Sequence, residues 1–419
     1  MTTADVADLS LAPAGEARIA WADARMPVLR SIRERFGAER PLDGVTVAAC
    51  LHVTAETANL VRALMAGGAD VALAAANPLS TQDDTAAALV ERHGAEVRAR
   101  RGEDAETYAS HVAALAGRRP HVTLDDGADL VTVLHAGPAE LRERLIGGAE
   151  ETTTGLLRVR RLEAEGRLLC PVVAVNEARA ERVFNDFYGT GQSTLDGILR
   201  ATNLLLAGQT LVVVGYGWTG RGVALRARGA GAQVIVCEVD PLRALEARME
   251  GFEVMPALDA AARGDVFVTV TGSRDVLRRE HFERMKDGAV LANAGHFDVE
   301  ISLGDLRALA REVRDVLPLV QEYDLGDRRL NLLASGRVVN LAAGQGHPAA
   351  VMDMSFSLQA LVVEDLVRRG ATLEPRVHPV PDRIDREIAL LKLASLGVEI
   401  DELTPEQEAY LGAWGQPRA

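Results

Sequence analysis

A strand-like run of apolar residues that ends in a glycine-rich turn constrains the fold of this chain more than any other stretch. Residues 211–220 read Leu-Val-Val-Val-Gly-Tyr-Gly-Trp-Thr-Gly, which gives three glycines the spacing G-x-G-x-x-G. Such a turn lets the backbone approach a pyrophosphate and places a helix N-terminus against it. A second apolar run, 233–237, ends at Glu238, where a carboxylate can bind a ribose 2′-hydroxyl and repel a 2′-phosphate. The stretch therefore predicts a Rossmann domain that binds NAD, rather than a glycine turn with only a structural role.

The composition is that of a globular protein with room for about two or three domains. The chain has 419 residues, of which 48% are hydrophobic and 25% charged. A net charge of −14 without a basic block argues against a nucleic-acid partner. Cys50, Cys170 and Cys237 are isolated, which is typical of reduced thiols and predicts no metal site. Because no apolar run is long enough to span a membrane and no signal sequence is visible, we expect a cytoplasmic protein without a membrane partner.

Strand and helix patterns alternate along the chain, as they do in parallel, doubly wound sheets. The apolar runs predict strands at 45–50, 71–75, 122–124, 172–175, 211–214, 233–237, 266–270, 289–292 and 338–341. Helical patterns predict helices at 16–36, 55–66, 83–93 and 192–206, and from about 350 and 383. We therefore expect an α/β fold of two doubly wound, Rossmann-like domains plus a short C-terminal helical segment.

This order of elements places the NAD-binding domain in the middle of the chain, so that the chain crosses between the domains twice. The polar segments 176–188 and 341–348 are the candidate hinges at these crossings. The predicted segments are a mobile tail (1–15), a substrate-binding domain (16–188, completed by 342–395), the NAD-binding domain (189–341) and a C-terminal segment (396–419).

Polar side chains follow three predicted strands of the first domain. His52 and Thr54 come after the first strand, residues 77–82 after the second, and residues 125–129 after the third. In open α/β sheets, ligands bind outside the carboxyl ends of the strands. A single histidine or aspartate at such a place is more often solvated or caps a helix. Three polar clusters on one edge, however, predict a substrate site that faces the NAD-binding domain.

Seven segments, taken together, resemble the adenosylhomocysteinase family. They occur in order between about Glu16 and Leu411, and they are 50–57, 77–83, 124–129, 150–155, 215–222, 295–300 and 346–348. The chain is similar to the shorter bacterial and archaeal branch of that family. The resemblance implies tightly bound NAD, an adenine nucleoside as substrate, and a homotetramer or homodimer.

The resemblance also implies a reaction in which NAD is an internal catalyst. A sugar hydroxyl is oxidised to a ketone, which acidifies the hydrogen on the adjacent carbon because the carbanion formed there is an enolate. The group on the next carbon is then eliminated, water adds to the alkene, and the ketone is reduced again. The net reaction is therefore not a redox reaction.

The family motifs assign roles to particular residues of this chain. By resemblance, Thr54 and Glu56 contact the adenine, and Glu151 holds the sugar hydroxyls. The catalytic candidates are His52, Asp126, Glu151, Glu181, Asn185, Asp186 and His296. The substrate-binding candidates are Thr54, Glu56, Asn77, Gln82, Asp126, Glu151 and His347. The cofactor-binding candidates are Thr152, Thr153, Thr154, Gly215, Tyr216, Gly217, Trp218, Thr219, Gly220, Glu238, Arg243, Thr271, Gly272, Ala294, Gly295, His296 and Asn340.

One segment departs from the family pattern. The family carries Asn-Asp-x-x-x-Lys-x-x-x-Asp-Asn-x-Tyr-Gly, whereas residues 176–189 read Asn-Glu-Ala-Arg-Ala-Glu-Arg-Val-Phe-Asn-Asp-Phe-Tyr-Gly. Glu181 therefore stands at the lysine position, Asn185 at the aspartate position and Asp186 at the asparagine position. In the family, that lysine and aspartate act on the sugar 3′-hydroxyl during hydride transfer. Both the charge and the hydrogen-bonding sense are thus changed at this place.

Three functional hypotheses follow from this departure. The sequence favours a specialised nucleoside dehydratase, which removes water from the exocyclic CH2OH of a hexulose nucleoside and leaves an exocyclic alkene. That reaction converts psicofuranine (angustmycin C) to angustmycin A in antibiotic biosynthesis, and Glu181 or Asp186 would be the base at the hydroxyl. The alternative is an ordinary S-adenosylhomocysteine hydrolase that tolerates the change. The third is a catalytically inactive NAD-binding regulator, against which the retained His52, Asp126 and His296 argue.

Overall fold

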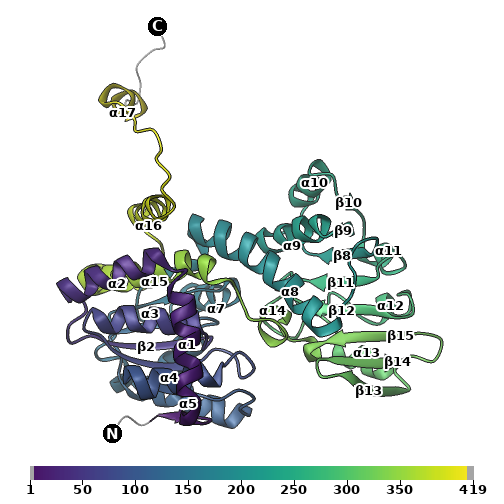
Figure 1. The fold of residues 1–419 in the computed structure, drawn as a ribbon, viewed down its shortest axis with the longest axis horizontal. Coiled ribbons are helices and arrows are strands. Elements are labelled where there is room, and N and C mark those ends of the chain that lie inside the picture. The colour runs from purple at the N-terminus through teal and green to yellow at the C-terminus, as the bar shows by residue number, and fades with distance from the viewer. Residues whose placement is uncertain (1–3, 413–419) are drawn as a thin grey trace.

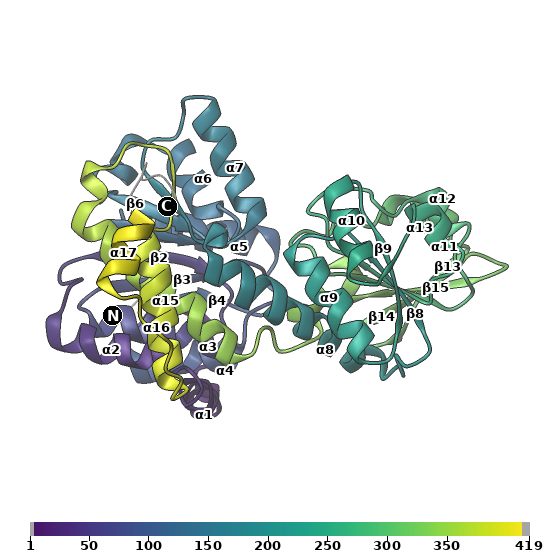
Figure 2. The same cartoon turned by 90° about the horizontal axis from the view of Figure 1, so that it is seen from above.

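The computed structural model describes residues 4–412, which form two α/β lobes joined side by side (Figure 1). Each lobe is built on an eight-stranded sheet. Helices cover both faces of these sheets, as Figure 2 shows for the first lobe. The predicted class, two doubly wound Rossmann-like units, is confirmed.

The first sheet has the strand order β1–β4–β3–β2–β5–β6–β7–β16, and all its strands are parallel. Its strands are β1 (Asp5–Val6), β2 (Thr46–Leu51), β3 (Asp70–Ala75), β4 (Glu96–Ala99), β5 (Val122–Asp125), β6 (Gly147–Glu150), β7 (Val172–Ala174) and β16 (Val377–Pro379). Val47 and Ala49 pack into the core on one face of β2, and Ala48 and Cys50 into the core on the other. Since both faces are covered, this strand reads as a continuous apolar run.

The helices of the first lobe are α1 (Ala12–Asp23), α2 (Pro27–Glu39), α3 (Ala55–Ala66), α4 (Asp83–His93), α5 (Ala105–Gly117), α6 (Asp129–Ala136) and α7 (Thr153–Ala164). The sequence predicted α3 and α4 with these bounds, but it predicted a single helix in place of α1 and α2. The break falls at Pro27, because proline lacks a backbone N–H and its ring clashes with the carbonyl four residues earlier.

The N-terminal residues also differ from the expected tail. Asp5 and Val6 pair with Arg98 and Ala99 at the edge of the sheet, and α1 already begins at Ala12. A strand of two residues is too short to show an alternation of polar and apolar residues, so β1 is recognised only by its pairing with β4. The first three residues of the predicted tail lie outside the described residues.

The second sheet has the order β10–β9–β8–β11–β12–β15–β14–β13. Its strands are β8 (Thr210–Val214), β9 (Gln233–Cys237), β10 (Glu253–Val254), β11 (Val266–Thr269), β12 (Ala289–Asn293), β13 (Glu312–Leu317), β14 (Val320–Asp324) and β15 (Arg329–Leu333). Its helices are α9 (Trp218–Gly229), α10 (Pro241–Met249), α11 (Ala257–Ala261), α12 (Arg279–Phe282) and α13 (Leu303–Leu309). The antiparallel pairing of β13, β14 and β15 extends the parallel sheet and was not predicted.

The strand predicted at 338–341 was wrong. Val339–Ala342 form one helical turn, α14, and Val338 makes only an isolated bridge to Asn293. The place beside β12 is taken by β15, after which positive φ angles at Ala334 and Ser335 turn the chain away from the sheet. A short apolar run cannot by itself separate a strand from a helical turn.

Two segments connect the lobes (Figure 2). The first contains the polar segment that was predicted to be a hinge, and within it Glu181–Thr190 form a π-helix that continues directly into α8 (Gly191–Thr202). The second leads from α14 to α15 (Ala349–Arg369), which packs on α2 and α3 of the first lobe. Because β16 also pairs with β7, the residues after the second crossing complete the first lobe.

The C-terminal residues form two further helices. α16 (Asp382–Ser395) packs on α15 and α2, whereas α17 (Pro405–Gly412) stands away from both lobes in Figure 1. Within residues 4–412, every helix is too short or too polar to cross a membrane.

Candidate active site

The carboxyl ends of both sheets meet at one cavity between the lobes. The strand order reverses between β2 and β5 in the first sheet, and between β8 and β11 in the second. Such a reversal opens a crevice in which ligands bind. His52 and Asp126 follow β2 and β5, while Gly215 and Thr271 follow β8 and β11. All four residues line the same cavity, which has a volume of about 1160 Å³.

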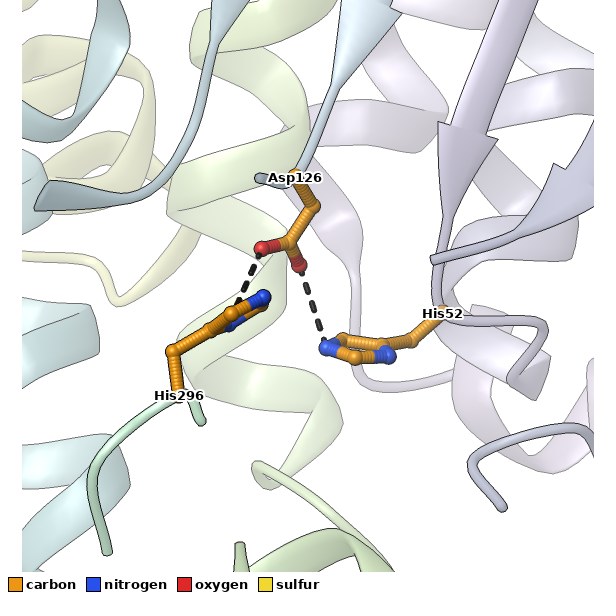
Figure 3. A group of neighbouring side chains, drawn as sticks. All are labelled: His52, Asp126 and His296. Atoms are coloured by element: carbon orange, nitrogen blue, oxygen red, sulfur yellow. Dashed lines mark ion pairs between the residues drawn. The ribbon is translucent and has the colours of Figure 1, made fainter. Parts of the chain in front are cut away.

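Three titratable side chains point toward one another in this cavity (Figure 3). Asp126 Oδ2 lies 3.2 Å from His52 Nε2, and Asp126 Oδ1 lies 3.7 Å from His296 Nδ1. Ser80 Oγ, 2.6 Å from His52 Nδ1, fixes the orientation of that ring. Burial lowers the pKa of His52, although the Asp126 carboxylate opposes this shift. A neutral imidazole beside a carboxylate can accept or relay a proton.

The same three side chains have unused bonding capacity. Asp126 Oδ1 is buried and has no hydrogen-bond partner within the described chain. One ligand atom from each of the three lies within 4.8 Å of the other two, so the group could also hold a divalent cation. For proton transfer, the free carboxylate oxygen is an acceptor for a hydrogen of a bound molecule.

His347 contributes an uncharged ring from the second crossing. Its Nε2 lies 3.0 Å from Thr190 Oγ1 and 3.4 Å from Asn340 Nδ2. Burial lowers the pKa of His347 to about 4, and the nearby His52 adds to this effect. The ring is therefore neutral at neutral pH and offers hydrogen bonds without charge.

The segment that departs from the family pattern brings a carboxyl group into the first-lobe wall. Glu181 and Asn185 lie four residues apart on the π-helix and are both buried. Asn185 Nδ2 donates to Glu181 Oε1 and, over 3.2 Å, to Glu151 Oε1. Ser355 Oγ, from α15, lies 2.8 Å from Glu151 Oε1 and 3.1 Å from Glu181 Oε1. Two side chains thus bridge the two carboxyl groups.

These carboxyl groups are not ordinary acids. Burial raises the pKa of Glu151 to about 8, and Asp126 adds to the shift. Burial also raises the pKa of Glu181, with Glu151 as the next cause. The pKa of Asp186 rises to about 7 through burial, against the attraction of Arg182. Burial thus favours the protonated form of these carboxyl groups, in a wall where the family motif carries an ammonium.

The second-lobe wall fits a dinucleotide. Gly215 has a φ of +104°, and a Cβ there would lie 2.8 Å from the carbonyl oxygen of Val270. A Cβ on Gly220 would lie 2.0 Å from the carbonyl oxygen of Gly215, so only glycine lets α9 approach β8 this closely. Glu238 accepts from the backbone N–H of Tyr216 at 2.6 Å and lines the cavity beside this turn. A carboxylate at this place suits a ribose 2′-hydroxyl.

Glu300 and Asn293 shape this wall and were not predicted as site residues. Glu300 accepts from the backbone N–H groups of Thr271, at 2.8 Å, and Gly272, at 2.9 Å. Asn293 Oδ1 accepts from the backbone N–H of Gly295 at 2.8 Å. Both side chains are buried, so they position the loops from behind. Glu300 is the last residue of the motif 295–300, which the sequence did reveal. Its role could not be predicted, because Glu300 holds Thr271 and Gly272, which belong to the loop after β11.

Most of the predicted site residues line the cavity, and four do not. Asn77 Oδ1 accepts from Leu79 N–H, at 2.9 Å, within its own turn. Gln82 Oε1 accepts from Ala55 N–H, at 3.1 Å, and lines a separate neighbouring pocket. The other two, Gly220 and Glu181, lie behind the lining residues. The cavity also has lining residues that the sequence did not reveal, among them Arg182, Met352 and Phe356.

Two family models match the chain. Residues 186–346 match the NAD binding domain of S-adenosyl-L-homocysteine hydrolase, and residues 3–145 match S-adenosyl-L-homocysteine hydrolase itself. The first match coincides with the lobe that carries the dinucleotide cradle. NAD is thereby confirmed as the cofactor.

Similar proteins cover the chain almost completely. It is 59% identical over 411 residues to the adenosylhomocysteinase of Aquifex aeolicus, with 98% of each chain covered. It is 55% identical to the adenosylhomocysteinase of Thermosynechococcus vestitus, with 98% of this chain and 96% of the relative covered. It is 52% identical to the S-inosyl-L-homocysteine hydrolase of Methanocaldococcus jannaschii, with 98% and 99% covered. With both lobes matched and the cavity lined by its motifs, the chain belongs to the S-adenosyl-L-homocysteine hydrolase family.

Proposed function

We propose that this chain is an enzyme that uses tightly bound NAD to oxidise a sugar hydroxyl of an adenine nucleoside transiently, so that a group can be eliminated from the adjacent carbons. One observation carries the proposal: in a single cavity, the dinucleotide cradle of one lobe faces His52 and Asp126 of the other. A simple dehydrogenase needs the cradle and a base for the hydroxyl. The additional proton-handling groups support an elimination as well.

The residues of the cavity divide this work. Glu56, which is partly buried, accepts a hydrogen bond from the adenine amino group, and Glu151 binds the sugar hydroxyls. Bound NAD supplies the hydride acceptor and, at the end, the hydride donor. Asp126, through its free Oδ1, takes the proton from the carbon next to the ketone. His52 and His296 then hold and return protons at the leaving group and at the incoming water.

The comparisons favour a thioether as the bond that is cleaved. The relatives are named for S-adenosyl- or S-inosyl-L-homocysteine, and they are 52% to 59% identical over nearly the whole chain. This supports the ordinary hydrolase better than the dehydratase that the sequence favoured. An inosine derivative would present an oxygen where adenine presents its amino group, so Glu56 as a carboxylate supports the adenosyl substrate.

One observation keeps the dehydratase as a second candidate. The buried carboxyl group of Glu181 contacts Ser355, which is also a partner of Glu151. The wall on the sugar side therefore differs from the family pattern, whereas the residues on the adenine side and the C5′ side match it. A changed wall suits a changed sugar, such as the hexulose of psicofuranine, with water as the leaving group. No observation favours an inactive NAD-binding regulator.

Two incubations of the purified holoprotein separate these candidates. One contains adenosine and L-homocysteine, the other psicofuranine, and in each we would follow product masses and the near-ultraviolet absorbance of the reduced cofactor. Synthesis of S-adenosylhomocysteine supports the hydrolase. Loss of water from psicofuranine, with an exocyclic alkene in the product, supports the dehydratase. Neither product and no cofactor reduction would overturn the whole proposal.

Membership of the family also supports a homo-oligomer, either a tetramer or a dimer, that works in the cytoplasm. Light scattering of the purified holoprotein tests the first point, because a monomeric mass would exclude it. Cell fractionation tests the second.

A further inference from the structure

The carboxyl groups of Glu151 and Glu181 share both of their hydrogen-bond partners. Glu151 follows β6, Glu181 lies on the π-helix, Asn185 lies one turn further along that helix, and Ser355 lies on α15. The Oε1 atom of each carboxyl group lies within hydrogen-bond distance of both Asn185 Nδ2 and Ser355 Oγ. Three separate elements therefore converge to hold the two Oε1 atoms together.

Counting hydrogens shows that this arrangement needs an extra proton. The Asn185 amide has two hydrogens and can donate to both carboxyl groups, but the Ser355 hydroxyl has only one. Ser355 donates to one carboxyl group and can satisfy the other contact only by accepting. A proton on the carboxyl group of that side supplies the hydrogen that this contact lacks.

The charges around the pair lead to the same conclusion. Both groups are buried, and the strongest influences on their pKa values include no cation. The charged groups that act on them are Asp126, from the end of β5, and Asp186, on the π-helix, and both are acidic. Arg182 acts on Asp186, and α15 brings only the uncharged Ser355 to the pair. Two adjacent buried carboxylates without a cation cannot both remain ionised.

Each carboxyl group of the pair also has one oxygen atom without a partner. Glu151 Oε2 and Glu181 Oε2 are buried and have no hydrogen-bond partner among the described residues. Glu151 lines the cavity together with Asn185, while Glu181 lies behind them. A molecule that places its hydroxyl groups at Glu151 would therefore contact a carboxyl group whose proton affinity depends on Glu181.

We propose that Glu151 and Glu181 act as one acid–base unit, which holds a single proton at rest and takes a second from the sugar hydroxyl as its carbon is oxidised. This inference rests on the proposed function. The O–H and C–H bonds of the carbinol break, the proton goes to the pair, the hydride with its electron pair goes to bound NAD, and the C=O bond forms. When the ketone is reduced at the end of the reaction, the same proton returns to the oxygen. Glu151 is the catalytic residue here, and Glu181 is a positioning residue that acts through it.

The change in charge explains why a second carboxyl group can replace a lysine. The pair carries one negative charge before the oxidation and none after it, while the nicotinamide loses its positive charge in the same step. The pair and the nicotinamide together therefore add no net charge to the buried cavity in either state, which keeps the cost of burial low.

Glu181→Gln tests the proposal in the holoprotein. The amide of glutamine can donate to Glu151, so Glu151 no longer needs the shared proton and becomes a stronger acid. We expect the infrared band of protonated carboxyl groups, identified by its shift in D2O, to lose the contribution of one group at neutral pH, while buried carboxyl groups outside the pair, such as Asp186, keep theirs. We also expect the midpoint of the pH profile of cofactor reduction to fall by about one to two pH units. Glu181→Asp should keep both signals, and Glu177→Gln, an exposed change on the same crossing, should alter neither.

The two readouts separate this inference from the proposed function. If wild-type protein reduces its cofactor with a nucleoside but Glu181→Gln keeps the band and the pH profile, the shared proton is excluded and the proposed function stands. If no nucleoside reduces the cofactor, both proposals fail as statements about catalysis. If Glu181→Gln does not fold, Ser355→Ala replaces it, because this variant removes one of the two bridging side chains and keeps both carboxyl groups; the midpoint of the pH profile should then rise, and an unchanged profile there would equally overturn the inference.

Discussion

Asp126 and His52 are in contact because their strands are neighbours at the reversal of the first sheet. β2 and β5 pair directly, although β3, β4 and three helices separate them in the chain. The backbone N–H of Asp126 donates to the carbonyl of Cys50 at 3.0 Å, which fixes the start of the loop after β5. The 3.2 Å contact between the two side chains is thus set by the sheet itself.

Replacing Asp126 with asparagine should stop proton abstraction and leave the oxidation intact. Asparagine keeps the shape of the side chain but cannot accept the proton, and loss of a general base costs about two to four orders of magnitude in rate. The measurement is exchange of the nucleoside C4′ hydrogen with D2O by NMR, alongside cofactor reduction. Ser80→Ala, which removes the contacts of Ser80 Oγ with His52 Nδ1 and with the carbonyl of Asn77, is the milder control. Normal exchange in Asp126→Asn would exclude Asp126 as the base.

The pair of changes Glu181→Lys and Asn185→Asp should favour thioether chemistry over dehydration. The ammonium would pair with Glu151 and lower the pKa of that carboxyl group. We expect the ratio of S-adenosylhomocysteine synthesis to psicofuranine dehydration to rise about tenfold, which corresponds to roughly 1.4 kcal/mol. Mass spectrometry of mixed-substrate reactions measures the ratio. Glu177→Lys makes the charge change of Glu181→Lys outside the cavity, and a ratio that moves equally in that control would refute the role of position 181.

Gly220→Ala should expel the cofactor and destabilise the second lobe. The added methyl group would lie 2.0 Å from the carbonyl oxygen of Gly215, so α9 must move away from β8. Overpacking of this kind costs about 1–3 kcal/mol. Gly229→Ala, at the end of the same helix, is the matched control, because its Cβ would have no heavy atom within 4 Å. Equal NAD content and thermal stability in the two variants would contradict the prediction.

His347 should make the protein less stable in acid. Folding lowers the pKa of this ring from 6.5 to about 4, so the unfolded chain binds the proton more tightly. The stability that depends on the neutral ring is therefore complete above pH 6.5 and is lost as the pH falls toward 4, by about 3 kcal/mol at most. Glu151, whose pKa is raised by folding, makes the protein more stable as the pH falls. The effect of His347 is therefore measured as the difference in pH dependence between wild type and a variant, and not from the wild-type curve alone.

Denaturant unfolding across that pH range would compare wild type with His347→Gln. The variant should lose less stability in acid than the wild type. His378→Gln is the control, because His378 lies outside the cavity and bonds only a backbone carbonyl, that of Glu374. An identical pH dependence in wild type and His347→Gln would show that His347 does not cause the loss.

The sequence predicted the parts of the fold that depend on local patterns. The glycine spacing at Gly215 and Gly220 identifies a strand, a helix and a cofactor at once. Each glycine stands where a side chain would block the tight turn, the pyrophosphate or the packing of the helix on the strand. Helices α3 and α4 have their observed bounds because polar residues precede the apolar pattern and glycines follow it. The catalytic candidates His52 and Asp126 could be grouped because both follow strands whose carboxyl ends share an edge.

Features that depend on distant partners could not be predicted in this way. β1 exists because β4 pairs with it, and α14 replaces a strand because β15 already occupies the edge of β12. Met352 and Phe356 line the cavity from α15, but on an apolar helix they look like core positions. The bridging role of Ser355 likewise requires α15 to return from the second lobe.

The π-helix at the first crossing joins the chemistry to the shape of the molecule. Its first half carries Glu181 and Asn185 against Glu151, and its last residue runs without interruption into α8, which packs on α9 and α14 of the second lobe. A rotation of one lobe against the other would therefore twist this helix. Parting of the lobes would then also move the side chains of Glu181 and Asn185 away from the sugar hydroxyls. Release of the nucleoside and dismantling of its hydroxyl clamp would then be a single mechanical event.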